Sequence, residues 1–368
     1  MNTEVCAATR RIEAASLTLM AGKPVLIVSG TGSSQSAAVA ISASLASTRW
    51  TAWAVRHTSG LLCAAVPSSR ADELELPAMV RGKDDGSGTP AFAIGVDAAE
   101  GIGTGISATD RTRTVRVIAD PRSRPEDLTR PGHVLPLRTA PRGAIEQDTA
   151  AEAAVDLCAI ALLEPVALTA TLVNDDGTLT RSAALENFTR DHRVPLVHVR
   201  DVVHHRVHHG DGRVGRVREV ASRDIDVPEG TLRVSEFKDE VTDATHFAYF
   251  GGGSATGNPK VYVIVECAHR DPLALGCACQ QVLETRRAQV AGTDGVVIYV
   301  RPDPWPSRRY AVPEKELTQG AITSILTTLG VAGANVNVWP GNQGWLPSCG
   351  QDVSPRVRDT GREVLVAH

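Results

Sequence analysis

Residues 25–40 read VLIVSGTGSSQSAAVA. The apolar run at 25–28 precedes a stretch rich in glycine and serine, and small residues follow it. This order predicts a buried strand, a glycine turn and then a helix. It is also the layout of a phosphate-binding loop, yet Gly30 and Gly32 are followed by no third glycine and by no Gly-Lys-Ser/Thr ending. A plain connection between a strand and a helix explains the stretch better, and the surrounding sequence has to decide.

The composition indicates a cytoplasmic protein of two domains. A chain of 368 residues has room for two domains of ordinary size. A net charge of −4 argues against nucleic acid or a membrane surface as a partner, and an aromatic content of 4% argues against stacking platforms for single strands. No apolar run is long enough to span a membrane, and the N-terminal segment has no apolar signal core. Seven cysteines, an odd number, favour reduced thiols over a disulfide framework.

The pattern of the sequence changes near residue 208. Helical and strand-like stretches alternate up to about residue 205, which is typical of an α/β fold. The segment HHRVHHGDGRVGRV at 204–217 is polar and punctuated by glycine, and it predicts a linker. Consecutive strand patterns begin at about residue 228. We therefore expect a first domain at 1–208, a linker at 209–227 and a second domain at 228–368, both of the α/β (α+β) class.

Seven segments carry a resemblance to known families. RHTSG (56–60), TGISATDR (104–111), RPGHVLPLR (130–138), EAAVDL (152–157) and NDDGT (174–178) occur in this order. Together they resemble 3,4-dihydroxy-2-butanone 4-phosphate synthase, an enzyme of riboflavin biosynthesis, over residues 10–208. VECAHRDPLALGCAC (265–279) and GAITSILTTLGV (320–331) resemble GTP cyclohydrolase II, a domain often fused to that synthase. The resemblance implies a synthase-like domain followed by a shortened cyclohydrolase-like α/β domain.

The first domain departs from the synthase pattern where that family carries its metal and proton-transfer groups. The acidic loop, whose glutamates bind Mg²⁺ in the family, falls on SGTGSSQSAA at 29–38, which has no carboxylate. Ala150 stands where the resemblance places a metal-binding histidine, and Gln147 where it places a phosphate-binding arginine. Thr171 stands where it places a catalytic glutamate. We therefore expect no Mg²⁺ in the first domain and no parent synthase activity on ribulose 5-phosphate.

Other family motifs are retained, and the resemblance implies that they bind a phosphorylated small molecule. The implied phosphate- or substrate-binding residues are Thr104, Ser107, Arg111, Arg130 and Glu152. Hydroxyls, an arginine and the N–H groups of a helix N-terminus form a good seat for a phosphate. The candidate catalytic residues are His133, His57 and Asp110, because imidazole and carboxylate groups exchange protons near neutral pH. Structural roles remain open, namely helix caps for Ser107 and Asp110, a carboxylate pair for Arg111 and a core position for His57.

The second domain contains a possible zinc site. Cys267, Cys277 and Cys279 have the spacing C-x9-C-x-C, and three thiolates with one open position make a catalytic zinc arrangement. The cyclohydrolase family has C-x10-C-x-C, and three reduced thiols without an ion are the alternative. Its nucleotide-binding segment also has no counterpart before residue 320, so we expect no GTP cyclohydrolase activity. His204 and His208 could bind another metal if the linker were helical.

These departures predict a diverged homologue that has lost both parent activities. The first expectation is a repurposed, metal-independent enzyme that acts on a phosphorylated metabolite, in specialised metabolism. A non-catalytic ligand-binding protein, acting as a regulator or scaffold for riboflavin-pathway enzymes, is the second, and whether the chain is an enzyme stays open between them. An active riboflavin-biosynthesis enzyme is a remote third reading. The resemblance also implies a homodimer formed through the first domain, because the family builds its sites at a two-fold interface.

Overall fold

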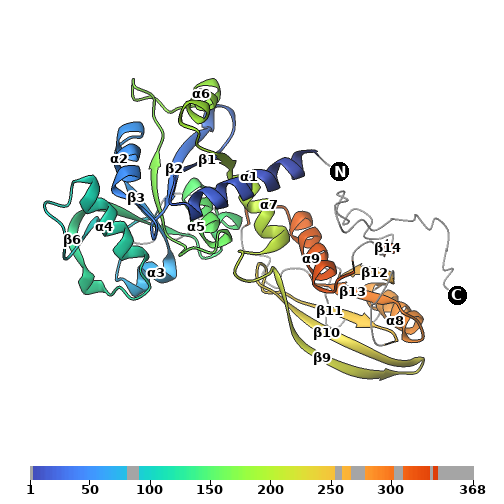
Figure 1. The fold of residues 1–368 in the computed structure, drawn as a ribbon. Coiled ribbons are helices and arrows are strands. Elements are labelled where there is room, and N and C mark those ends of the chain that lie inside the picture. The colour runs from blue at the N-terminus through green and yellow to red at the C-terminus, as the bar shows by residue number, and fades with distance from the viewer. Residues whose placement is uncertain are drawn as a thin grey trace.

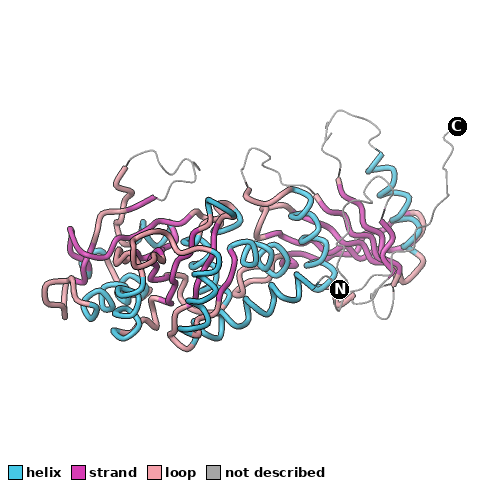
Figure 2. The backbone as a smooth tube through the Cα atoms, turned by 90° about the horizontal axis from the view of Figure 1, so that it is seen from above, coloured by secondary structure: helices cyan, strands magenta, loops and turns pink. Residues whose placement is uncertain are grey.

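The structure is a computed structural model that describes residues 3–80, 91–252, 259–266, 278–301, 310–331 and 335–338. Its two domains lie end to end, each built around one β-sheet (Figure 1). Figure 2 shows the same arrangement from above, with helices of both domains at the junction. No helix within these ranges is both long and apolar enough to cross a bilayer.

The first domain has a mixed sheet between two layers of helices. The strand order is β4-β6-β3-β7-β2-β1-β8, and β5 pairs with β6. The strands are β1 (Val25–Ser29), β2 (Ser36–Ser42), β3 (Cys63–Pro67), β4 (Ala91–Phe92), β5 (Val96–Ala98), β6 (Leu128–Thr139), β7 (Ala167–Thr171) and β8 (Leu196–His198).

Alternating side chains of these strands bury against opposite helix layers. Leu26 and Val28 point into the cluster that contains residues of α2 (Thr48–His57), α4 (Ala108–Ala119) and α6 (Ser182–His192). Val25 and Ile27 point into the cluster formed with α1 (Thr3–Met20), α5 (Ala150–Ile160) and α7 (Val199–His209). The sheet is therefore covered on both faces. Helix α3 (Ser68–Glu73) and the single-turn helices η1 (Gly32–Ser34), η2 (Pro125–Asp127) and η3 (Gly143–Ile145) complete the domain.

The helix predicted after the glycine turn at 30–35 is wrong, because residues 36–42 form β2. This strand pairs with β1 in the antiparallel direction, with Ser29 opposite Ser36. Ala37, Val39 and Ile41 all enter one core cluster, so the apolar period is two and not 3.6. Pairing with β7 on the other side places β2 inside the sheet, and tertiary packing outweighs the helix propensity of its alanines.

The second domain has a sheet of order β14-β12-β13-β11-β10-β9. Its strands are β9 (Val217–Val227), β10 (Gly230–Asp239), β11 (Thr245–Phe250), β12 (Lys260–Val265), β13 (Val296–Val300) and β14 (Asn335–Val338), and its helices are α8 (Ala278–Ala291) and α9 (Glu314–Thr328). Much of the segment 209–227, which the sequence predicts as a linker, is thus the edge strand β9. The histidines at 204–209 lie in helix α7, because the valines at 202, 203 and 207 give this segment a buried face.

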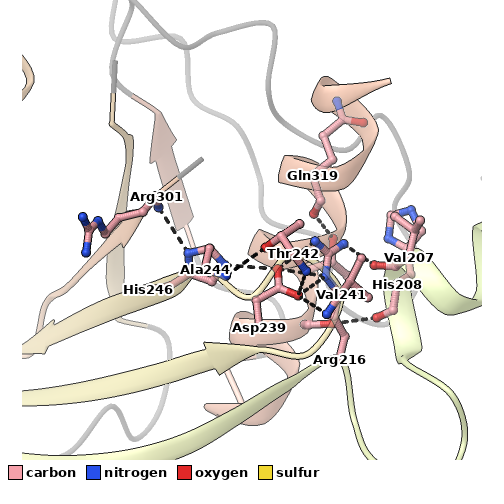
Figure 3. Close-up of polar contacts among 12 residues, drawn as sticks. Val207, His208, Arg216, Asp239, Val241, Thr242, Ala244, His246, Arg301 and Gln319 are labelled. Atoms are coloured by element: carbon pink, nitrogen blue, oxygen red, sulfur yellow. Dashed lines mark hydrogen bonds and ion pairs between the residues drawn. The ribbon is translucent and has the colours of Figure 1, made fainter. Parts of the chain in front are cut away.

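A fully buried ion pair lies where the second domain meets helix α7 of the first domain (Figure 3). Arg216 lies 2.9 Å from Asp239, measured from Nη2 to Oδ2, and both side chains are 0% exposed. Arg216 also donates a hydrogen bond to the backbone carbonyl of Val207 in α7. Burial alone would raise the pKa of Asp239, but the Arg216 charge and a hydrogen bond from His246 hold it far below its usual value. The pair is therefore charged, and it bonds the second domain to the last turn of α7.

Candidate functional site

The directions of the strands bring several family motifs to one edge of the first sheet. Strands β1 and β7 end at this edge. Strands β2, β3 and β6 begin there, because β2 runs antiparallel to both β1 and β7, β3 runs antiparallel to β7, and β6 runs parallel to β3. We call this the His133 edge. The connection at 30–35 and His133 both lie on it. The carboxyl end of β6 lies at the opposite edge.

His133 is held by a buried carboxylate that the motifs did not reveal. Its Nδ1 lies 2.7 Å from Oδ2 of Asp97, and its backbone N–H donates a 3.0 Å hydrogen bond to Oδ1 of the same residue. Asp97 is 7% exposed, whereas the His133 side chain is 41% exposed. The carboxylate favours the tautomer with hydrogen on Nδ1, which leaves Nε2 as the unprotonated nitrogen of the neutral ring. The arrangement gives an accessible imidazole a fixed orientation suited to taking a proton.

Asp110, predicted as catalytic, has its carboxylate engaged with the loop that packs on this pair. Its Oδ1 and Oδ2 accept hydrogen bonds from the N–H groups of Gly103 at 3.2 Å and Gly105 at 3.1 Å. Burial opposes ionisation, but these bonds and those from Ser107 lower the pKa of Asp110. Gly105 has a φ of +87°, and a Cβ there would lie 2.2 Å from Oδ2 of Asp97. Asp110 therefore positions the loop around Asp97 and His133.

The predicted phosphate-binding residues divide into exposed hydroxyls and engaged arginines. Thr104 and Ser107 are exposed, and Ser107 Oγ also caps α4 by accepting the N–H of Asp110 at 3.0 Å. Arg111 is buried and donates to the carbonyl of Gly60 at 3.2 Å, while its Nε has no hydrogen-bond partner within the described ranges. Arg130 donates to carbonyls of Leu74, Glu75, Pro125 and Leu128, so its guanidinium ties chain segments together.

His57 and Glu152 contact residues other than Asp97 and His133. His57 ends α2, and its ring packs against that of His192 in α6 at a tilt of 59°, with ring centroids 4.6 Å apart. Glu152 is 4% exposed and lies in the first turn of α5, beyond the carboxyl end of β6. It accepts a hydrogen bond from the N–H of Ala140 and another from the hydroxyl of Thr149. Burial raises the pKa of Glu152. Within a single chain, residues 149–152 therefore lie at the edge of the first sheet opposite the connection at 30–35.

The described residues do not fit the Mg²⁺ that the resemblance implies. Hard cations need several oxygen ligands, usually including carboxylates, whereas residues 30–35 offer only glycine, threonine, serine and glutamine. Within the described part of the chain no group of three or more His, Cys, Asp or Glu side chains could hold a metal ion. Cys267 and Cys277 lie outside the described residues, and the side chain of Cys279 is not described either, so the predicted zinc stays a prediction.

Comparisons with known proteins agree with the motifs. Residues 13–205 match the family model described as 3,4-dihydroxy-2-butanone 4-phosphate synthase. Riboflavin biosynthesis protein RibBA of Salinispora arenicola (strain CNS-205) is 38% identical over 293 residues, which cover 79% of this chain and 69% of the relative. The 3,4-dihydroxy-2-butanone 4-phosphate synthase of Proteus mirabilis (strain HI4320) is 36% identical over 54% of this chain and 90% of its own length.

A solved structure extends the likeness to both domains. The crystal structure of RibBX, a two-domain 3,4-dihydroxy-2-butanone 4-phosphate synthase from A. baumannii, has a TM-score of 0.62 and is 26% identical. It covers 93% of this chain and 97% of its own. A mixed α/β chain with a synthase-like first domain and a fused second domain is therefore confirmed.

The expectation that the chain has lost both parent activities and serves another reaction is wrong. A relative named as a riboflavin biosynthesis protein is 38% identical over 79% of the chain, which supports an active riboflavin-biosynthesis enzyme. Three segments depart from the family pattern, yet residues 13–205 as a whole match the family, and the hydrogen-bonded pair of Asp97 and His133 was not among the motifs. The chain belongs to the 3,4-dihydroxy-2-butanone 4-phosphate synthase family.

Proposed function

We propose that this chain is an enzyme of riboflavin biosynthesis that forms 3,4-dihydroxy-2-butanone 4-phosphate. The resemblance supplies ribulose 5-phosphate as the substrate. The observation that carries the proposal is the Asp97–His133 pair, which lies inside the matched residues 13–205 and exposes an oriented imidazole. The relatives that share this region are named as a riboflavin biosynthesis protein and as the synthase itself.

The residues at the His133 edge can each be given a task. Nε2 of His133 takes a proton from the carbon or hydroxyl next to the substrate carbonyl, and Asp97 stabilises the imidazolium that forms. The exposed hydroxyls of Thr104 and Ser107, at the N-terminal end of α4, bind the phosphate. No step is assigned to Mg²⁺, because residues 30–35 do not provide its ligands.

We further propose a homodimer, which is supported by the positions of two family segments at opposite edges of the first sheet. In the family, the segments aligned with 29–38 and 149–152 both contribute to the metal site. Here they lie at opposite edges of one sheet, so one chain alone does not bring them together, whereas a second copy would place its Glu152 at the His133 edge if the family's dimer is kept. A cytoplasmic location and a further protein partner are also proposals.

The test is an assay of the purified full-length chain with ribulose 5-phosphate. Product is detected by mass spectrometry, with the Proteus mirabilis synthase as the positive control. We expect the butanone phosphate to form, and His133→Gln to lower the rate about 100-fold or more. Addition and chelation of Mg²⁺ show whether the altered loop has removed the dependence on metal. No product at enzyme concentrations equal to the substrate, while the control turns over, would refute the proposal.

A further inference from the structure

A cavity lies on the α2–α6 side of the His133 edge. Its volume is about 1100 Å³, and it is lined by the end of α2, the turn at 173–177 and one side of α6. We call it the α2–α6 pocket. Asp97, Thr104, Ser107 and His133 do not line it, so it is separate from the pair that carries the proposed function. Its size is ample for a small metabolite.

Several polar side chains that line the pocket make no hydrogen bond within the described residues. The Asp176 carboxylate is engaged by Thr178, which donates from its N–H at 2.9 Å and its hydroxyl at 2.6 Å. In contrast, the side chains of Arg56, Ser59, Asp175, His57 and His192 have no hydrogen-bond partner within the described residues, although all five line the cavity. Polar groups gathered at one concave surface are what orients a bound ligand.

Two imidazoles lie on the wall of the pocket within a small aromatic cluster. The His57 and His192 rings are 4.6 Å apart, and Phe188 lies 4.2 Å from His192, measured between ring centroids. Burial lowers the pKa of His57, and the nearby His192 and Arg56 lower it further, while Asp175 opposes them. A neutral imidazole has one N–H donor and one acceptor nitrogen. A hydroxyl group likewise donates one hydrogen bond and accepts others, so the two imidazoles can each bind a hydroxyl group of a ligand.

The charge of the lining argues against a phosphate. Arg56 contributes one guanidinium, whereas Asp175 and Asp176 contribute two carboxylates, so a phosphate dianion would meet net repulsion. Phe188 adds an aromatic face against which a carbon chain can pack. We propose that the α2–α6 pocket binds a neutral, hydroxyl-rich small molecule such as a polyol, held by His57, His192 and Ser59. This binding goes beyond the proposed synthase function and does not rest on it.

The experiment compares ribitol with ribitol 5-phosphate, which differ only in the phosphate and cannot be enolised. Each is titrated into the full-length chain while imidazole signals are followed by NMR with labelled histidine. We expect ribitol to shift the His57 and His192 signals saturably in the millimolar range, and ribitol 5-phosphate to bind there no more tightly. Saturation only by the phosphorylated compound, or no shift with either, would overturn the proposal.

Variants assign the signals and test the contacts. His192→Gln should weaken ribitol binding about fivefold, the effect of one lost hydrogen bond. Ser59→Ala should weaken it too while leaving the ring cluster intact, so a folding defect of the histidine variant does not decide the outcome. His209→Gln, an exposed histidine of α7, is the matched control and should leave the affinity unchanged. Unchanged affinity in both pocket variants would contradict the proposed site.

Discussion

Arg142 of the first domain donates a 2.6 Å hydrogen bond from Nη1 to the hydroxyl of Tyr310 in the second domain. The same guanidinium donates to the carbonyl of Val241 and to Asp243, each at 2.5 Å. Three residues later along the first domain, the carbonyl of Ile145 accepts a hydrogen bond from the N–H of Ala311 at 2.8 Å. The second domain thus holds the segment that leads into the first turn of α5, at the edge where we place the dimer contact.

Replacing Arg142 should loosen the junction. Arg142→Ala removes three hydrogen bonds of a charged donor, and we expect the unfolding free energy to fall by about 2–3 kcal/mol. Thermal unfolding and hydrogen exchange of residues 139–152 measure the change. Arg122→Ala is the matched control, since its pair with Asp120 is on the surface, where solvent screens the attraction and little stability is expected from it. Equal effects of the two variants would show that the Arg142 hydrogen bonds at the junction add no more to the unfolding free energy than a surface ion pair does.

Breaking the buried pair between Arg216 and Asp239 should cost more. Asp239→Asn leaves the fully buried guanidinium without its counter-charge, and removal of one partner of such a pair costs about 3–5 kcal/mol. Chemical denaturation followed by tryptophan fluorescence and by circular dichroism measures the loss. Asp226→Asn, on the exposed part of β9, is the control. A loss below about 1 kcal/mol would mean that the counter-charge of Asp239 is not needed to keep the guanidinium in the folded chain.

Stability should decline as the pH falls below about 6.5. Burial, followed by neighbouring histidines, lowers the pKa of His205 to about 4 and that of His208 to about 3. An unfolded histidine has a pKa of about 6.5, so the unfolded chain binds protons first and is stabilised relative to the folded chain as the pH falls. The contribution is complete above about pH 6.5 and is lost toward pH 4.

The measurement for this pH dependence is the melting temperature between pH 7.5 and pH 4.5. We expect a loss of stability on the order of 2 kcal/mol between pH 7 and pH 5. His208→Gln should flatten the profile because glutamine does not titrate. A profile identical to that of the parent chain would assign the pH dependence to other groups.

Asp97→Asn should reduce the synthase reaction without unfolding the chain. The amide keeps the shape of the carboxylate but cannot stabilise an imidazolium, and we expect kcat to fall about 100-fold or more with little change in KM. The pH profile of kcat/KM and the nitrogen chemical shifts of His133 report whether its tautomer has changed. Asp72→Asn, on a carboxylate that pairs with Arg138, is the control. A shift in KM alone would assign Asp97 to substrate binding.

The sequence predicted much of the framework because the framework depends on short-range patterns. Ser107 was predicted as a helix cap from its position before Asp110, and it caps α4. The strand at 36–42 was missed, since a run of alanine and serine has little β propensity and gains its conformation from pairing with β1 and β7.

The Asp97–His133 pair could not be found from spacing alone. The two residues are 36 positions apart and meet only because β5 and β6 pair. Arg216 was hidden for a similar reason, since a polar segment rich in glycine gives no sign that one of its arginines is fully buried. Buried charges are paired through the tertiary fold, and only the fold reveals the partner.

The edge strand β9 has a consequence for behaviour at high concentration. Nearly all of its residues between Arg218 and Asp226 are exposed, and arginine, glutamate and aspartate recur along it. An open strand of this length would otherwise recruit another chain through its backbone, whereas charged side chains make such pairing costly. These charges therefore oppose fibrillar self-assembly. Replacing them with valine or threonine would leave an edge strand that pairs with other copies of the chain and promotes aggregation.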